Sequence, residues 1–133
     1  MKKNAALLNR GAVMIVDNEP AALSVMMRIV LTGGYTPLPC RDMADVRSYF
    51  ASSLVPLVVV TDVALDDGET GMAVYEFVQK TSPSTPVIFV SGYDNVRIPV
   101  SSRLLLKPFG VDEFLSAISD ACGQSTCSRV VQR

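Results

Sequence analysis

The sequence of 133 residues contains no histidine, and this absence narrows the chemistry open to the chain. Serine and cysteine hydrolases that use histidine as general base are excluded. The usual zinc spacings are excluded as well, because the three cysteines, Cys40, Cys122 and Cys127, are not clustered. An odd number of scattered cysteines also provides no disulfide framework. Any chemistry must therefore use carboxylates, hydroxyls and amines.

The chain also lacks a strong net charge and any long apolar run. Twelve basic and thirteen acidic residues give a formal charge of −1, and their scatter argues against nucleic acid and anionic membrane as partners. No apolar run is long enough to span a bilayer. The short apolar stretch at residues 5–8 is interrupted by Asn9 and Arg10 before it could form the core of a signal peptide. We expect a cytoplasmic protein.

Apolar residues make up 49% of the chain and charged residues 19%, a composition typical of a packed globular domain. A chain of this length has room for one such domain. We place it at residues 11–122 and expect flexible tails at residues 1–10 and 123–133.

Short apolar runs alternate with helical patterns along this domain. The runs predict five strands, of which the second contains two prolines and so suits a sheet edge, at residues 12–16, 35–40, 57–62, 86–90 and 104–106. Apolar spacings of three and four predict helices at residues 20–31, 42–50, 72–78 and 111–122. This alternation predicts an α/β fold with an open parallel sheet and helices on both faces. Ligands of such sheets bind at the carboxyl ends of the strands.

Four of the five predicted strands end in a polar residue. The first is followed by Asp17-Asn18-Glu19, and later ones end at Asp62, Ser91 and Lys107. Each residue alone has an ordinary explanation, as a helix cap, a turn or the end of a strand. The parallel fold would gather all of them in one crevice, so their joint occurrence favours a functional site.

In this order the residues resemble the receiver domains of two-component response regulators. The matching stretches are residues 14–20, 58–63, 86–93 and 105–109, and the resemblance covers about residues 11–122. It implies a flavodoxin-like (CheY-like) three-layer sandwich with strand order 2-1-3-4-5. It also implies a phosphoacceptor aspartate and, as donor, a histidine kinase or histidine phosphotransfer protein. Such a chain is a switch that phosphorylates and slowly dephosphorylates itself, not a turnover enzyme.

The residue types agree with these roles. A carboxylate such as Asp62 can form an acyl phosphate, but a cation is needed to hold a carboxylate and a phosphoryl group together. Asp17, Asn18 and Asp62 supply the hard oxygen ligands that Mg2+ prefers. The resemblance adds the backbone carbonyl of Ala64 as a further ligand.

Lys107 and Ser91 complete the predicted site. The Lys107 ammonium would pair with one phosphoryl oxygen, and the Ser91 hydroxyl would donate a hydrogen bond to another. Phosphorylation adds about 1.5 to 2 negative charges, enough to shift the population of two surface conformations. The tails are too short for a DNA-binding module, so we expect an unidentified downstream protein as partner, with the chain itself a monomer or weak dimer.

The chain departs from the family at Asn18, where Asp or Glu is usual. An amide oxygen ligates Mg2+ with one negative charge fewer, so we expect weaker metal binding unless Glu19 takes part. This departure keeps open the alternative of a pseudo-receiver that is not phosphorylated and acts as a constitutive protein-binding module.

A second departure lies between the fourth and fifth strands. The connection, residues 91–103, has only thirteen residues and contains Pro99, so its helix should be short or absent. This resembles a stand-alone receiver subclass with a Phe-Ala-Thr-Gly-type motif. Leu105 stands where the switch aromatic is usual, and Tyr93 is the nearest aromatic that could replace it. The connection after Asp62 is one residue longer than usual.

Two other classes share parts of this pattern. A flavodoxin-like FMN carrier needs a Ser-, Thr- or Gly-rich phosphate cradle after the first strand, where the acidic Asp17 and Glu19 would repel phosphate. A phosphohydrolase of the haloacid dehalogenase type needs its nucleophile on the first strand and a second aspartate two positions later, which here is Glu19. Flavin colour would identify the FMN carrier, and repeated turnover of a phosphate ester would identify the phosphohydrolase.

Overall fold

The computed structural model describes residues 9–64 and 71–130. Within these residues the structure has five strands and four helices, in the order β1 (Ala12–Val16), α2 (Pro20–Thr32), β2 (Thr36–Cys40), α3 (Met43–Ala51), β3 (Val58–Asp62), α4 (Gly71–Thr81), β4 (Val87–Ser91), β5 (Arg103–Leu106) and α5 (Val111–Val130). All strand pairs are parallel, in the order β2-β1-β3-β4-β5. The flavodoxin-like fold and its strand order are confirmed.

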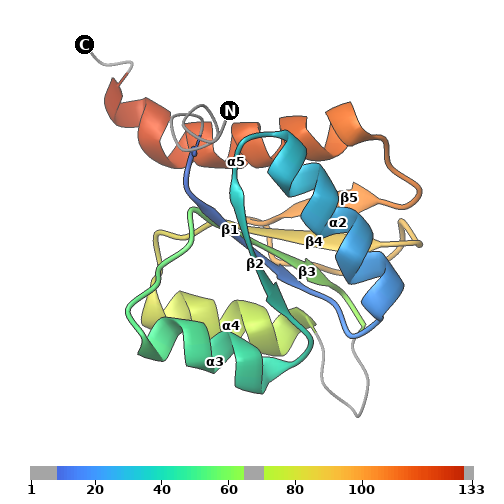
Figure 1. Ribbon diagram of the computed structural model, residues 1–133, viewed down its shortest axis with the longest axis horizontal. Coiled ribbons are helices and arrows are strands. Elements are labelled where there is room, and N and C mark those ends of the chain that lie inside the picture. The colour runs from blue at the N-terminus through green and yellow to red at the C-terminus, as the bar shows by residue number, and fades with distance from the viewer. Residues whose placement is uncertain (1–8, 65–70, 131–133) are drawn as a thin grey trace.

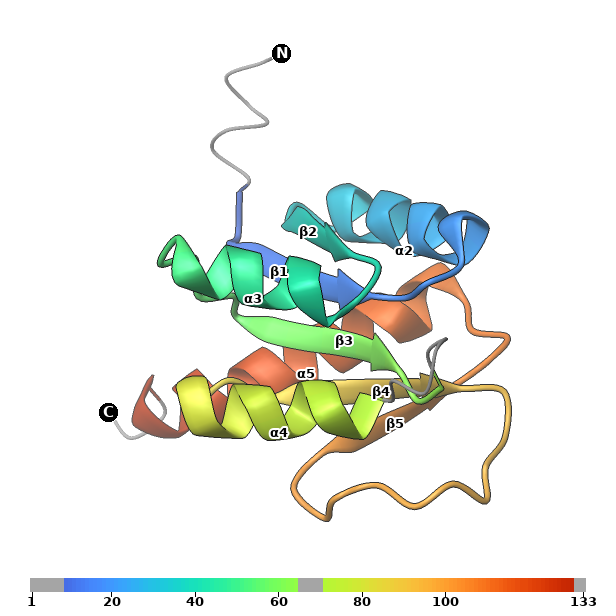
Figure 2. The ribbon, with the colours of Figure 1, turned by 90° about the horizontal axis from the view of Figure 1, so that it is seen from below.

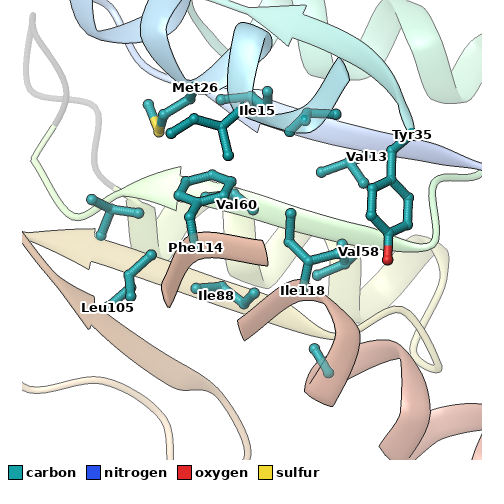
Figure 3. Packing of buried hydrophobic residues seen from close by; sticks show 14 of the residues in the cluster. Val13, Ile15, Met26, Tyr35, Val58, Val60, Ile88, Leu105, Phe114 and Ile118 are labelled. Carbon is teal, nitrogen blue, oxygen red and sulfur yellow. The ribbon is translucent and has the colours of Figure 1, made fainter. Parts of the chain in front are cut away.

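The sheet lies between two layers of helices, with α2 and α5 on one face and α3 and α4 on the other (Figures 1 and 2). Alternation along the strands explains the two layers. Val13 and Ile15 of β1 pack with α2 and α5, whereas Met14 and Val16 pack with α3 and α4. Figure 3 shows Phe114 of α5 packed over the first of these faces. Because both faces are covered, the central strands read as unbroken apolar runs.

The prolines of β2 lie on a sheet edge, as predicted. Pro37 and Pro39 pair with β1 on one side, and no strand of the described part of the chain lies on the other side of β2. A proline has no N–H to offer a further strand, so this edge resists pairing with another chain.

The connection between β4 and β5 contains no helix. Residues 92–102 form bends and turns and project from the sheet as an open loop (Figure 2). The carbonyl of Pro99 accepts hydrogen bonds from the N–H and the hydroxyl of Ser102, at 3.0 and 2.6 Å. Ile98 is half-buried against the cluster under α3 and α4, whereas Val100 is fully exposed. The expected loss of this helix is confirmed.

The predicted end of α5 near Cys122 is wrong, because the helix continues to Val130. Gly123 weakens a helix by about 1 kcal/mol but does not end it, and no proline follows before Val130. Residues 123–130, expected as part of a flexible tail, are therefore helical. The acidic loop at residues 65–70, the N-terminal residues 1–8 and residues 131–133 lie outside the described residues. Within the described part of the chain, no helix is both long and apolar enough to cross a bilayer.

Candidate functional site

Sheet register brings Asp17 and Asp62 together. Val16 of β1 pairs with Thr61 of β3, so the next residue on each strand, Asp17 and Asp62, lies at the same carboxyl edge of the sheet. Neighbouring strands are about 4.8 Å apart. The two carboxylates therefore face one small region without the help of any loop.

Asp17 is almost fully buried, with 1% of its surface exposed. Its Oδ1 accepts a hydrogen bond of 2.9 Å from the N–H of Glu19, but its Oδ2 is buried and has no hydrogen-bond partner among residues 9–64 and 71–130. Burial raises the pKa of Asp17, and this effect exceeds the lowering by the Glu19 N–H and by the charge of Lys107. An ionised carboxylate with a buried oxygen left unpaired is a group that a cation would stabilise.

Asp62, at the end of β3, is the better solvated of the two carboxylates, with 19% of its side chain exposed. Its Oδ2 lies 4.0 Å from Nζ of Lys107. The pKa of Asp62 is raised, and burial is the largest cause, with a smaller contribution from the Asp17 charge. The Lys107 charge and hydrogen bonds from the N–H groups of Ala64 and Val63 lower this pKa in part. Asp62 is thus held by fixed backbone donors and one ammonium, with a second carboxylate nearby.

The other two predicted ligands are Asn18 and the backbone carbonyl of Ala64. Asn18 is half-buried, and Glu19 is exposed at the start of α2. The described residues contain no group of three or more His, Cys, Asp or Glu side chains arranged to hold a metal, and Asn18 offers an amide oxygen beside the two carboxylates. Ala64 donates its N–H to the Asp62 carboxylate, and the ligand role of its carbonyl stays a prediction.

These donors fit Mg2+. This ion keeps several water ligands and usually takes one or two carboxylates from the protein. Asp17 and Asp62 supply two carboxylates, and no other described residue competes for the Oδ2 of Asp17. The residues therefore suit a partly hydrated Mg2+ ion held by few protein ligands.

Ser91 lies at the same edge, but its hydroxyl is engaged elsewhere. The N–H of Lys107 donates to the Ser91 carbonyl at 2.8 Å, which brings the ends of β4 and β5 together. The buried Ser91 hydroxyl accepts from the N–H of Tyr93 at 2.9 Å and donates to the carbonyl of Tyr93 at 3.0 Å. A hydroxyl has one proton. Ser91 can donate to a phosphoryl oxygen only after its bond to the Tyr93 carbonyl breaks.

The predicted switch aromatic, Tyr93, is 74% exposed. Its backbone holds the Ser91 hydroxyl, and its role as a reporter of phosphorylation stays a prediction.

Gly71, the first residue of α4, packs against the backbone of Asp62 and was not predicted as a site residue. Its N–H donates to the carbonyl of Val63 at 2.8 Å. A side chain at this position would overlap the backbone carbonyl oxygen of Asp62 and press on the ring of Phe89. Only glycine lets the helix begin this close to the strand that carries Asp62. The sequence signal was a glycine at the start of the predicted helix.

No protein-family profile matches the chain, but individual proteins and solved structures are similar to it. The DNA-binding transcriptional regulator NtrC of Escherichia coli is 27% identical over 120 residues, which cover 86% of this chain and 25% of that protein. The chain thus spans about a quarter of the length of this curated relative.

Two solved structures are similar over nearly their whole length. The beryllofluoride-activated NtrC4 receiver domain dimer is 28% identical, with a TM-score of 0.75, and 86% of this chain covers 98% of it. The response regulator receiver protein of Sinorhizobium medicae is 20% identical, with a TM-score of 0.76, and 86% of this chain covers 95% of it. The homologues and structural neighbours of the chain are response regulator receiver domains. Membership of the Phe-Ala-Thr-Gly-type subclass stays a prediction.

Proposed function

We propose that this chain, a receiver domain by its homologues and structural neighbours, accepts a phosphoryl group on Asp62 and changes a protein-binding surface in response. One observation carries the proposal. The ammonium of Lys107 lies 4.0 Å from the Asp62 carboxylate, at an edge where the Asp17 carboxylate has an unpaired buried oxygen. This arrangement offers a nucleophile, a fixed positive charge and a place for a cation within one small region.

In the proposed step, a carboxylate oxygen of Asp62 attacks phosphorus while the bond from phosphorus to the donor breaks and the donor keeps the electron pair. The donor is a histidine kinase or histidine phosphotransfer protein. Lys107 neutralises part of the phosphoryl charge, and the Ser91 hydroxyl donates to a phosphoryl oxygen after leaving Tyr93. Asp17, Asn18 and Asp62 would hold Mg2+, which when bound compensates the negative charge of the reacting groups.

A protein donor needs a surface to contact beside Asp62. An apolar groove of about 370 Å³ borders the site, lined by Glu19, Ala22, Val25, Met26, Lys107, Pro108 and Phe109. We place the donor there because Lys107 belongs both to the groove and to the site. Val25 is 52% exposed in its wall, so Val25→Glu should slow phosphorylation by the protein donor and leave phosphorylation by acetyl phosphate unchanged.

In this proposal the product is the phosphorylated chain itself. The chain releases phosphate slowly and carries out no repeated turnover of a small substrate. Phosphorylation adds about 1.5 to 2 negative charges beside Lys107. The protein response is a shift in the population of conformations of the loop that begins after Ser91.

Beryllofluoride, a phosphoryl mimic, tests the proposal directly. With Mg2+, it should shift amide signals of the wild-type chain near Asp62, Ser91 and Lys107, and should shift none in Asp62→Asn. Asp94→Asn removes an exposed carboxylate of the loop instead and should respond like the wild type. Identical spectra of wild type and Asp62→Asn, with and without the reagent, would overturn the proposal and favour a constitutive binding module.

A further inference from the structure

Tyr75, on α4, connects the Asp62 region to the open loop at residues 92–102. Gly71 and Tyr75 are four residues apart and therefore lie on the same side of this helix. Phe89 of β4 contacts both residues, with its ring next to Gly71 and its centroid 6.1 Å from that of Tyr75. Gly71 in turn abuts the backbone of Asp62. A continuous series of packed groups thus runs from the phosphoacceptor to Tyr75.

The far end of this series is a hydrogen bond. The hydroxyl of Tyr75 lies 3.1 Å from Oγ of Ser101, two residues before β5 begins. Between Tyr93 and Ile98 the loop is mostly exposed, and Ile98 is a half-buried anchor. The Tyr75–Ser101 bond therefore ties the end of the loop to α4.

We propose that the Tyr75–Ser101 hydrogen bond is a latch that holds the loop in the arrangement in which Ser91 donates to Tyr93, and that phosphorylation of Asp62 opens it. The inference rests on the proposed function. Both ends of the loop then change together: Ser91 turns from Tyr93 to the phosphoryl group, and α4, seated against the Asp62 backbone, moves Tyr75 relative to Ser101. Tyr75 would thus act in place of the switch aromatic that Leu105 does not supply.

Linkage gives this latch a measurable consequence. If phosphorylation opens the bond, then removing the bond must favour the phosphorylated arrangement by the same free energy. An exposed hydrogen bond of this kind corresponds to about a two- to tenfold change in affinity. Tyr75→Phe and Ser101→Ala should each tighten apparent beryllofluoride binding by that factor at fixed Mg2+.

A double-mutant cycle separates the latch from general loosening. Because Tyr75→Phe removes only the hydroxyl and keeps the ring against Phe89, its fold should be intact. If the two residues act through one bond, the double variant should bind beryllofluoride no more tightly than either single variant. Without reagent, loop amide signals of both single variants should already move toward their beryllofluoride-bound positions. Tyr49→Phe, which removes a tyrosine hydroxyl from α3, should bind as the wild type does.

The outcomes distinguish this inference from the function on which it rests. A wild-type chain that fails to respond to beryllofluoride removes both. If the wild type responds, three results would overturn the latch and leave the proposed phosphorylation of Asp62 in place. These are unchanged beryllofluoride affinity in Tyr75→Phe, weaker binding in the variants, or effects of the two substitutions that add in the double variant.

Discussion

The two halves of the candidate site are built in opposite ways. Asp17 directly follows β1 and Asp62 ends β3, two paired central strands, and backbone N–H groups hold both carboxylates. Ser91 also ends a strand, but the chain beyond it is an open loop, and its hydroxyl bonds to that loop. Sheet register therefore fixes the positions of Asp17 and Asp62, whereas the Ser91 hydroxyl, which we propose responds to phosphorylation, bonds to a mostly exposed loop.

One strand and its continuation show this contrast most clearly. Phe89 of β4 is 1% exposed, and Tyr93, four residues later, is 74% exposed. Burial of a large aromatic side chain contributes several kcal/mol to stability, and an exposed one contributes little. The open half can therefore change conformation without disturbing the core that holds the carboxylates.

The largest expected effect comes from truncating these two aromatics. Phe89→Ala should lower the free energy of unfolding by about 3 to 5 kcal/mol, because it leaves a cavity between the sheet and α4. Tyr93→Ala should change it by less than about 0.5 kcal/mol. Denaturant unfolding followed by circular dichroism measures both. Equal losses of stability in the two variants would contradict this contrast, because Tyr93 would then contribute as much to packing as Phe89 does.

Two glycines provide the next test. Gly71→Ala forces a methyl group against the Asp62 carbonyl and the Phe89 ring, so we expect a loss of about 1 to 3 kcal/mol and slower phosphorylation by acetyl phosphate. Gly92→Ala is the matched control, because a methyl group there meets no atom within 4 Å. It should be neutral in both measurements. An unaffected Gly71→Ala would show that the start of α4 does not position Asp62.

Burial of the Asp17 carboxylate should make the free energy of unfolding depend on pH. Burial raises its folded-state pKa, so the wild type loses stability as pH rises from about 3.8 through that raised pKa. Asp17→Asn has no charge to bury and should be more stable than the wild type near pH 7 by about 1 kcal/mol. This advantage should shrink as pH falls toward 3.8. Thermal unfolding across this range measures it, and a less stable variant at pH 7 would contradict the account.

The smallest expected effect concerns the metal. Asn18→Asp restores a third carboxylate at the fixed edge, so it should tighten Mg2+ binding by roughly three- to tenfold, which corresponds to about 0.6 to 1.4 kcal/mol. Asn95→Asp adds the same charge on the exposed loop and should leave the affinity nearly unchanged. Magnesium titration followed by amide signals compares the two. Equal affinities in wild type and Asn18→Asp would place residue 18 outside the ligand set.

The sequence predicted the strand ends that carry Asp17 and Asp62 better than the loop that follows Ser91, for a physical reason. Unbroken apolar runs such as residues 58–60 mark strands covered on both faces, and the first acidic residue after the run, Asp62, ends the strand at the carboxyl edge of the sheet. Pro99 and the short connection also predicted the missing helix, because proline and chain length act locally. These features depend on neighbours in sequence.

The missed features depend on contacts between distant residues. The Tyr75–Ser101 bond joins residues 26 positions apart through the path of an irregular loop, and nothing in the sequence fixes that path. The hydroxyl of Ser91 was expected to face the site, and only the turn geometry shows that it bonds to Tyr93. The helix end at Cys122 was misplaced because no strong stop signal is present there.

Chemical mapping of the modified residue tests whether Asp62 is the phosphoacceptor. The chain is incubated with acetyl phosphate and Mg2+, treated with borohydride to reduce any aspartyl phosphate to homoserine, and digested for peptide mass spectrometry. We expect homoserine at position 62 in the wild type, none without Mg2+, and much less in Lys107→Met. Absence of homoserine at position 62, or its appearance at another carboxylate, would contradict it.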